Sequence, residues 1–216
     1  LWGLQGFIKE FLFEGFQEGF FEVEKDKAIK YFKRRMQNSV GAIDVSHIEA
    51  LHDLQYLPVH IKALPEGTIV PIGMAVFTIK NTLKAFFWLT NLLETIISTE
   101  MWKPITAATI ALEYRKLCEK WATKTCDNDE HIQFQCHDFS MRGLGGWHDA
   151  ARTGSAHLLS FSGTDTVPAI DYLEEYYGAN SDKELVGASV PATEHSVMCM
   201  GSKEGEQVTV ERLLTE

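Results

Sequence analysis

The stretch LSFSGTDTVPAIDYLEEYY, residues 159–177, decides how the second half of the chain is built. It begins with a short apolar segment typical of a strand, continues through a polar turn, and ends with the apolar spacing of a helix. The same alternation is found on both sides of it. We expect strands near Ile132–Cys136, Leu159–Phe161 and Val186–Val190, and helices near Trp147–Leu158 and Val167–Tyr177. Strands that alternate with helices predict a parallel α/β sheet or barrel.

The first part of the chain predicts helices instead. One helical face carries Leu4, Phe7, Ile8, Phe11 and Leu12, and Gly15 and Gly19 are expected to interrupt that helix. A second helix is expected at 23–37, with Ile29, Phe32 and Met36 inward and its Lys and Arg side chains on a solvated face. Ser46 and Glu49 have the spacing of a capping box at the start of a third helix.

A small antiparallel β unit is expected between residues 57 and 81, because alternating apolar residues flank turns rich in Pro and Gly. Helical periodicity returns at 86–97, and Pro104 is expected to open a separate long helix. Its inward residues would be Ile105, Ala108, Leu112, Cys118 and Trp121. We therefore divide the chain into a helical and small antiparallel β region, 1–128, and an α/β region, 129–216.

Composition limits the function. The formal net charge is -10, so nucleic acid and anionic membranes would be repelled, and a small ligand is favoured. A phosphate group would need local Arg, Lys or backbone N–H groups. The apolar runs are too short to span a bilayer, and the four cysteines lack zinc-site spacing, which indicates reduced thiols and a cytoplasmic protein. Because the chain begins at Leu1 without Met, we expect that it starts inside a longer reading frame.

Polar side chains follow three of the expected strands. The segments are His137–Gly143 (HDFSMRG), Gly163–Thr166 (GTDT) and Ser189–Ser196 (SVPATEHS). In parallel α/β folds such loops converge on one open face, where sites are built. Each segment alone also has a structural interpretation: Asp165 could cap the following helix, and Arg142 could pair with Asp138.

The order HDFxxRG, GTDT and SVPAxEHS resembles nicotinamide phosphoribosyltransferases, within the family of nicotinate and nicotinamide phosphoribosyltransferases. The resemblance runs almost end to end and includes GLQ at 3–5, IKA at 61–63, PEG at 65–67, WLTN at 88–91, PIT at 104–106 and SAHL at 155–158. It implies that the chain is the N-terminal half of such an enzyme. The helical and small β part would then be followed by the first strands and helices of an irregular type II phosphoribosyltransferase α/β barrel.

The resemblance implies a reaction and a ligand set. A phosphoribosyl group would pass from phosphoribosyl pyrophosphate to the ring nitrogen of nicotinamide, giving nicotinamide mononucleotide and pyrophosphate in NAD salvage. Mg²⁺ would accompany the phosphoribosyl pyrophosphate, and ATP could act through phosphorylation of His195. No metal-ligating residue is assigned.

The resemblance also assigns residues. Phe139 would stack on the pyridine ring, and Ser189 and Val190 would line the base pocket. Asp165 would accept a hydrogen bond from the carboxamide and repel the carboxylate of nicotinate. Arg142 would lie near the base and the product phosphate. His195 and Asp165 form the expected catalytic set, supported by Glu194, His137 and Asp138.

The chain departs from the family in what it lacks. The later strands that bind ribose and phosphates would lie beyond Glu216, so we expect a homodimer or association with a chain that carries the missing C-terminal half. Half a barrel would leave an unpaired edge. Two alternatives remain: nicotinate as the substrate, for which Asp165 is the discriminating residue, and a truncated non-catalytic binding or assembly module.

Overall fold

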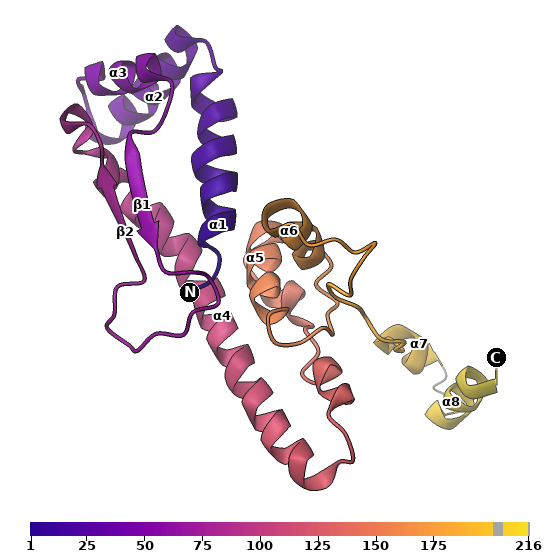
Figure 1. Cartoon of the computed structure of the whole chain (residues 1–216). Coiled ribbons are helices and arrows are strands. Elements are labelled where there is room, and N and C mark those ends of the chain that lie inside the picture. Colours follow the sequence, from indigo (N-terminus) through magenta and orange to yellow (C-terminus); the bar gives the residue numbers. More distant parts are fainter. Residues whose placement is uncertain (201–204, 216) are drawn as a thin grey trace.

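The described part of the chain, residues 1–200 and 205–215 of a computed structural model, is mostly helical with one small sheet (Figure 1). The α-helices are α1 (Leu4–Phe7), α2 (Lys25–Val40), α3 (Ser46–Leu54), α4 (Leu89–Thr125), α5 (Trp147–His157), α6 (Pro168–Tyr177), α7 (His195–Met200) and α8 (Glu206–Thr215). The long helix α4 has the sheet and α2–α3 at one end. α5 packs beside α4, α6 packs against α5 and α1, and α7 and α8 lie apart.

The first helix does not stop at its glycines. α1 continues as two π-helical segments, η1 (Ile8–Gly15) and η2 (Gln17–Phe21), with the Glu22 N–H donating to the Gln17 carbonyl at 2.8 Å. The expected interruption at Gly15 and Gly19 is therefore wrong. Glycine weakens a helix without blocking its backbone, and the buried aromatic residues at both ends hold this segment against the core.

Helices α2 and α3 form where they were expected, but the capping box is wrong. Ser46 is the first residue of α3, and both its N–H and its hydroxyl donate to the Asp44 carboxylate, each at 2.9 Å. These hydrogen bonds lower the pKa of Asp44. The Asp44 carboxylate, two residues upstream, thus accepts the hydrogen bonds at the start of α3, and the Ser46 side chain does not cap the helix.

The small β unit is confirmed. Strands β1 (Val59–Ala63) and β2 (Phe77–Asn81) pair antiparallel, with Ile61 opposite Ile79. The apolar side chains of both strands pack against the main cluster of buried residues, which lines α1, α3 and the first half of α4.

Pro104 lies inside α4 and does not open a new helix, so the expected break is wrong. Proline removes one helical hydrogen bond, but Pro104 is buried and its ring packs against Gly3. After Pro104, the buried residues of α4 are Ala111 and Ala122, while Trp121, expected inward, is 52% exposed. No described helix has the length and apolarity needed to cross a membrane.

The α/β region is confirmed in its helices and corrected in its strands. α5 and α6 match the expected ranges, but residues 130–134 form a 3₁₀ turn, η4 (Glu130–Phe134), in place of the first strand. Parallel pairing is limited, within the described residues, to single bridges, Asp138 with Thr164 and Gly163 with Ala188. A parallel strand needs a paired strand on each side to be stable, and here each segment pairs through single bridges. The strands of the expected barrel are therefore not formed in the described residues. The boundary at residue 128 stays a prediction.

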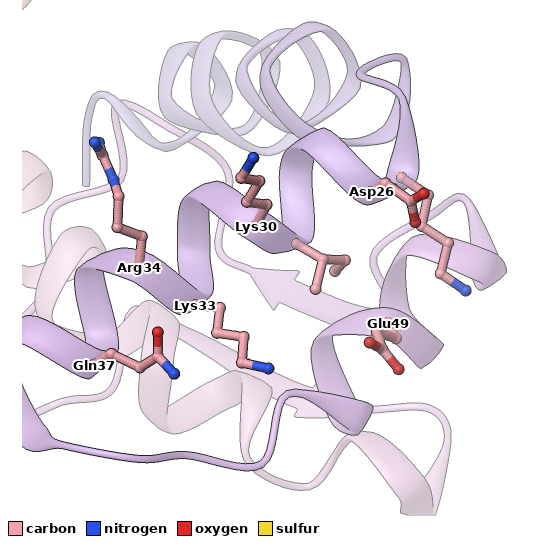
Figure 2. A pocket seen from close by; sticks show the side chains of 8 residues that line it. Asp26, Lys30, Lys33, Arg34, Gln37 and Glu49 are labelled. Atoms are coloured by element: carbon pink, nitrogen blue, oxygen red, sulfur yellow. The ribbon is translucent and has the colours of Figure 1, made fainter.

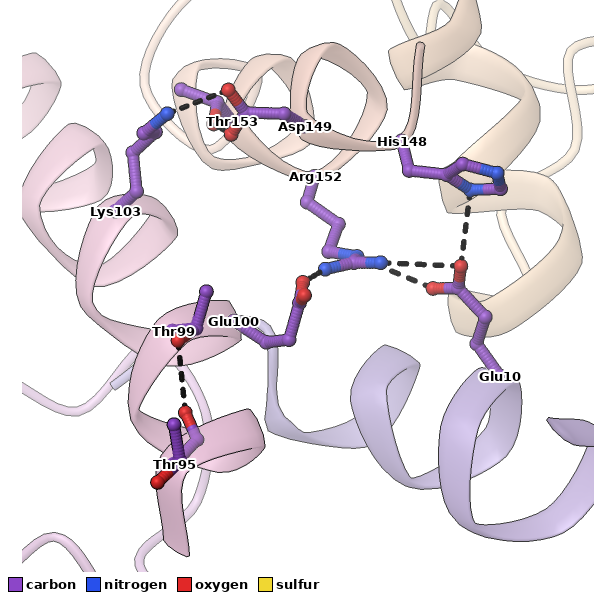
Figure 3. Close-up of polar contacts among 9 residues, drawn as sticks. All are labelled: Glu10, Thr95, Thr99, Glu100, Lys103, His148, Asp149, Arg152 and Thr153. Carbon is purple, nitrogen blue, oxygen red and sulfur yellow. Dashed lines mark hydrogen bonds and ion pairs between the residues drawn. The ribbon is translucent and has the colours of Figure 1, made fainter. Parts of the chain in front are cut away.

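A buried guanidinium joins three helices. Arg152 on α5, with a side chain 6% exposed, contacts Glu10 of η1 at 3.2 Å and Glu100 of α4 (Figure 3). His148 also approaches Glu10, at 3.1 Å, and Lys103 binds Asp149 at 2.6 Å. Paired carboxylates compensate for the loss of hydration at the guanidinium, so the contact fixes how α5 sits against the N-terminal helix and α4.

The close approach of α5 to α6 depends on Gly154. A Cβ at this position would lie 2.8 Å from Ala169 Cβ and 2.9 Å from Thr166 Cγ2. We expect Gly154→Ala to lower the free energy of unfolding by about 1–3 kcal/mol in chemical denaturation. Gly19→Ala is the matched control, because nothing lies within 4 Å of its added methyl, and it should leave stability equal or raise it by about 0.5–1 kcal/mol. Equal destabilisation by both changes would contradict the packing described here.

Removal of the buried cation should be far more damaging. Arg152→Met leaves Glu10 and Glu100 without their partner, so we expect unfolding to become easier by about 3–5 kcal/mol, measured by urea denaturation at neutral pH. Lys116→Met is the control, since Lys116 forms an exposed pair with Glu113 and its loss should change stability by less than about 1 kcal/mol. Similar effects of the two changes would argue against a structural role for Arg152.

Candidate functional site

Backbone hydrogen bonds bring the three polar segments together. The Asp138 N–H donates to the Gly163 carbonyl at 3.1 Å, and the Asp165 N–H donates to the Asp138 carbonyl at 2.9 Å. On the other side, the Thr164 N–H donates to the Ala188 carbonyl at 2.9 Å. The GTDT segment is therefore the middle one of three parallel segments.

Asp165 is the centre of this arrangement. His137 Nε2 lies 2.8 Å from Asp165 Oδ1, and Ser189 Oγ lies 2.6 Å from the same oxygen. The Ser189 hydrogen bond, then the His137 hydrogen bond, and more weakly the Arg142 charge hold the pKa of Asp165 below its usual range. Asp165 does not cap α6, whose N-terminus receives no side-chain hydrogen bond. One carboxylate oxygen thus holds the three segments together, and the side chain is still 46% exposed.

Phe139 packs against His137, the residue that binds this carboxylate, and is largely exposed. Its ring centroid is 4.4 Å from that of His137 at 32°, and the residue is 57% exposed. Val190, 41% exposed, follows Ser189 in the third segment. An exposed aromatic ring next to a hydrogen-bond acceptor can bind a flat molecule that carries N–H donors.

Asp138 supports the loop from beneath. It is 7% exposed, and its Oδ1 accepts the Ser140 N–H at 2.9 Å, which starts the short turn η5 (Ser140–Gly143). Asp138 forms no ion pair with Arg142, whose side chain is exposed on η5. Behind the loop, a hollow of about 390 Å³ between α4 and α5 is lined by Asp138 and His157 among others. Burial lowers the pKa of His157, against the opposing effect of the nearby Asp138.

His195 and Glu194 are not brought to this cluster. Both are exposed, and His195 is the first residue of α7. The Met198 N–H donates to the Glu194 carbonyl at 3.2 Å, a contact in the first turn of the helix itself. In Figure 1, α7 lies away from α5 and α6. The described chain therefore unites His137, Phe139, Asp165 and Ser189 but leaves the third segment's histidine outside.

A separate hollow of about 490 Å³ lies along α2, far from the cluster in the chain (Figure 2). Lys30, Lys33 and Arg34 line it together with Glu49 of α3. These cations lie around the buried Ile29 on the solvated face that was expected for α2. No buried polar group points into this hollow among the described residues, so it gives no sign of a second site.

Metal ligands and disulfides are not evident in the described chain. Across residues 1–200 and 205–215, no group of three or more His, Cys, Asp and Glu side chains is arranged to hold a metal ion. Cys118, Cys126, Cys136 and Cys199 all carry free thiols. The residues of the cluster thus do not form a Mg²⁺ site of their own, and Mg²⁺ stays a prediction.

The link between His137 and Asp165 was not foreseen in the sequence. The two residues are 28 positions apart, and only the parallel bridge between their segments brings them together. The glycine of GTDT is the one indication of this contact in the sequence. A Cβ at Gly163 would lie 2.8 Å from His137 Nδ1, so only glycine allows the histidine ring to approach this closely.

Comparison with known proteins agrees with the motifs. Residues 134–215 match the nicotinate phosphoribosyltransferase (NAPRTase) family. The nicotinamide phosphoribosyltransferase of Acinetobacter baylyi is 55% identical over 216 residues, which cover 99% of this chain and 42% of that protein. Those of Xanthomonas campestris pv. campestris and Mycoplasma genitalium are 34% and 33% identical, over 74% and 96% of this chain and 33% and 47% of their own lengths. The chain spans less than half the length of these curated relatives. The region that holds the Asp165 cluster thus lies within the match to the nicotinate phosphoribosyltransferase family.

Proposed function

We propose that this chain supplies the nicotinamide-binding part of an enzyme that transfers a phosphoribosyl group from phosphoribosyl pyrophosphate to nicotinamide. The observation that supports it is the Asp165 carboxylate, held through Oδ1 beside the exposed Phe139 ring. The relatives that match nearly the whole chain bear the same function in their names. The products would be nicotinamide mononucleotide and pyrophosphate.

Recognition of the base would combine stacking with one directed hydrogen bond. The pyridine ring would lie on Phe139, whose π face also favours the pyridinium that forms when the ring nitrogen is substituted. The carboxamide NH₂ would donate to Asp165. Val190 would limit the pocket on the side of the third segment, next to Ser189.

Charge would select the amide over the acid. The lowered pKa of Asp165 keeps it ionised at neutral pH, where the carboxylate of nicotinate would be repelled and would offer no proton in return. Nicotinate remains the alternative substrate, and the same residue decides between the two.

The phosphate side of the reaction would use few residues of this chain. Arg142 is exposed on η5 near the base cluster, and its guanidinium fork suits a phosphate bidentately. Mg²⁺ would enter with phosphoribosyl pyrophosphate and neutralise its charge. The remaining groups would come from a longer chain, a second polypeptide or a second copy in a homodimer.

His195 would couple the reaction to ATP. Its imidazole, exposed at the start of α7 next to Glu194, would attack the γ-phosphoryl group and form a phosphohistidine with release of ADP. Since Asp165 binds His137 and Ser189 and not His195, α7 would approach the base cluster only in the complete enzyme.

The amide preference can be tested at Asp165. In Asp165→Asn, the Asn oxygen can still accept from His137 and Ser189, so the free position becomes an NH₂ donor and the carboxamide loses its acceptor. We expect nicotinamide binding to weaken about 10- to 100-fold and rejection of nicotinate to relax, measured by calorimetric titration of both ligands.

Asp171→Asn is the matched control, because Asp171 is exposed on α6 and its change alters the net charge equally. Unchanged selectivity in Asp165→Asn would contradict the proposed role. Formation of the mononucleotide should also be assayed with the chain alone and then with any downstream polypeptide. Synthesis from nicotinate but not from nicotinamide would favour the alternative substrate.

The ATP step can be tested separately. Incubation with γ-labelled ATP should give an acid-labile label that His195→Gln abolishes and His131→Gln retains, since His131 is an exposed histidine on η4 outside the motif. Label that persists in His195→Gln would place the acceptor elsewhere.

A further inference from the structure

The two donors on Asp165 converge on one oxygen and leave the other open. His137 Nε2 and Ser189 Oγ both bind Oδ1, at 2.8 and 2.6 Å, and no hydrogen bond from the described residues reaches Oδ2. A carboxylate oxygen has two lone pairs, so Oδ1 is fully used. A ligand N–H must therefore bind Oδ2.

The donors come from the two segments that flank Asp165. His137 precedes the bridge at Asp138, and Ser189 follows the bridge at Ala188, so the carboxylate is held from both sides of the middle segment. Ser189 is exposed, whereas the side chain of His137 is only 9% exposed. A buried ring has fewer accessible orientations than an exposed hydroxyl, which makes His137 the stiffer of the two supports.

The surroundings of the ring define its tautomer. An ionised Asp165 can only accept, so Nε2 must carry the proton that lies between them. Nδ1 is buried without a hydrogen-bond partner and lies against the backbone at Gly163. A proton on Nδ1 would find no acceptor there, so the Nε2–H form satisfies the site better.

The same ring touches the base-stacking residue. Its centroid lies 4.4 Å from that of Phe139, so His137 joins the aromatic platform to the hydrogen-bond acceptor. A change in the His137 ring would displace Phe139 and Asp165 relative to one another, although His137 itself lies behind both.

We propose that His137 is a positioning residue whose Nε2–H fixes Asp165 through Oδ1, so that Oδ2 alone faces the ligand and amide is preferred over carboxylate. The ligand preference in this inference rests on the proposed function, whereas the positioning of Asp165 by His137 does not. His137 would not touch the substrate.

The structural part can be tested without any ligand. In ¹⁵N NMR spectra of the wild-type chain, His137 should show the Nε2–H tautomer. In His137→Met, which removes the donor, the ¹³C-detected pKa of the Asp165 carboxyl should rise toward the ordinary range of aspartate. In His137→Gln, which is similar in length to Met but retains an N–H donor, it should stay close to the wild-type position.

The functional part uses the same variants. Nicotinamide should bind about tenfold more weakly to His137→Met, with partial rescue in His137→Gln. Because the Asp165 pKa is raised in His137→Met, discrimination against nicotinate should fail at a higher pH than in the wild type. His60→Met and His60→Gln are the control pair, since His60 is exposed on β1.

The outcomes separate the two proposals. An Nδ1–H tautomer in the wild type would overturn the positioning role even if His137→Met failed to fold. An Asp165 titration that is the same in all three folded proteins would overturn it as well. The expected tautomer and titration without nicotinamide binding would support the positioning of Asp165 and count against the proposed substrate.

Discussion

The Arg152 guanidinium, buried between Glu10 and Glu100, is the contact on which the arrangement of the helices depends. It joins the N-terminal helix, α4 and α5, which are far apart in the chain. A buried charge tolerates little displacement, because any gap leaves it without hydration and without a partner. Trp2 adds a second contact, donating from Nε1 to Ser155 Oγ at 3.1 Å, so the first residues of the chain are fixed against α5.

This rigid support reaches the site through α5 and α6. Close packing at Gly154 holds the start of α6, and the GTDT segment lies between these two helices in the chain. The segment is therefore fixed at both ends, while two single bridges attach its neighbours. A carboxylate on such a segment can be pre-organised for a ligand, which reduces the entropy lost on binding.

Buried and exposed residues of the site have different roles. Asp138 is buried and the His137 side chain is only 9% exposed, and both orient the loops. Phe139, Asp165 and Ser189 are exposed enough to reach a ligand. His195 has no place in this arrangement, because α7 follows a long irregular segment and packs with α8 instead of with α5 or α6. The residues expected to bind the base are thus held together in the described chain, whereas His195, the histidine expected to be phosphorylated by ATP, lies apart from them.

The sequence by itself determined the helices α2, α3, α5 and α6, the small antiparallel sheet and the motifs that carry Phe139 and Asp165. These features depend on local periodicity and on short motifs, which a sequence displays directly. The tertiary structure alone decided that α4 continues through Pro104, that the glycines of the first helix do not end it, and that the expected barrel strands reduce to bridges. It also decided that His137 and Ser189 share one oxygen of Asp165. Each of these outcomes depends on contacts between residues distant in the chain, where packing overrides local preference.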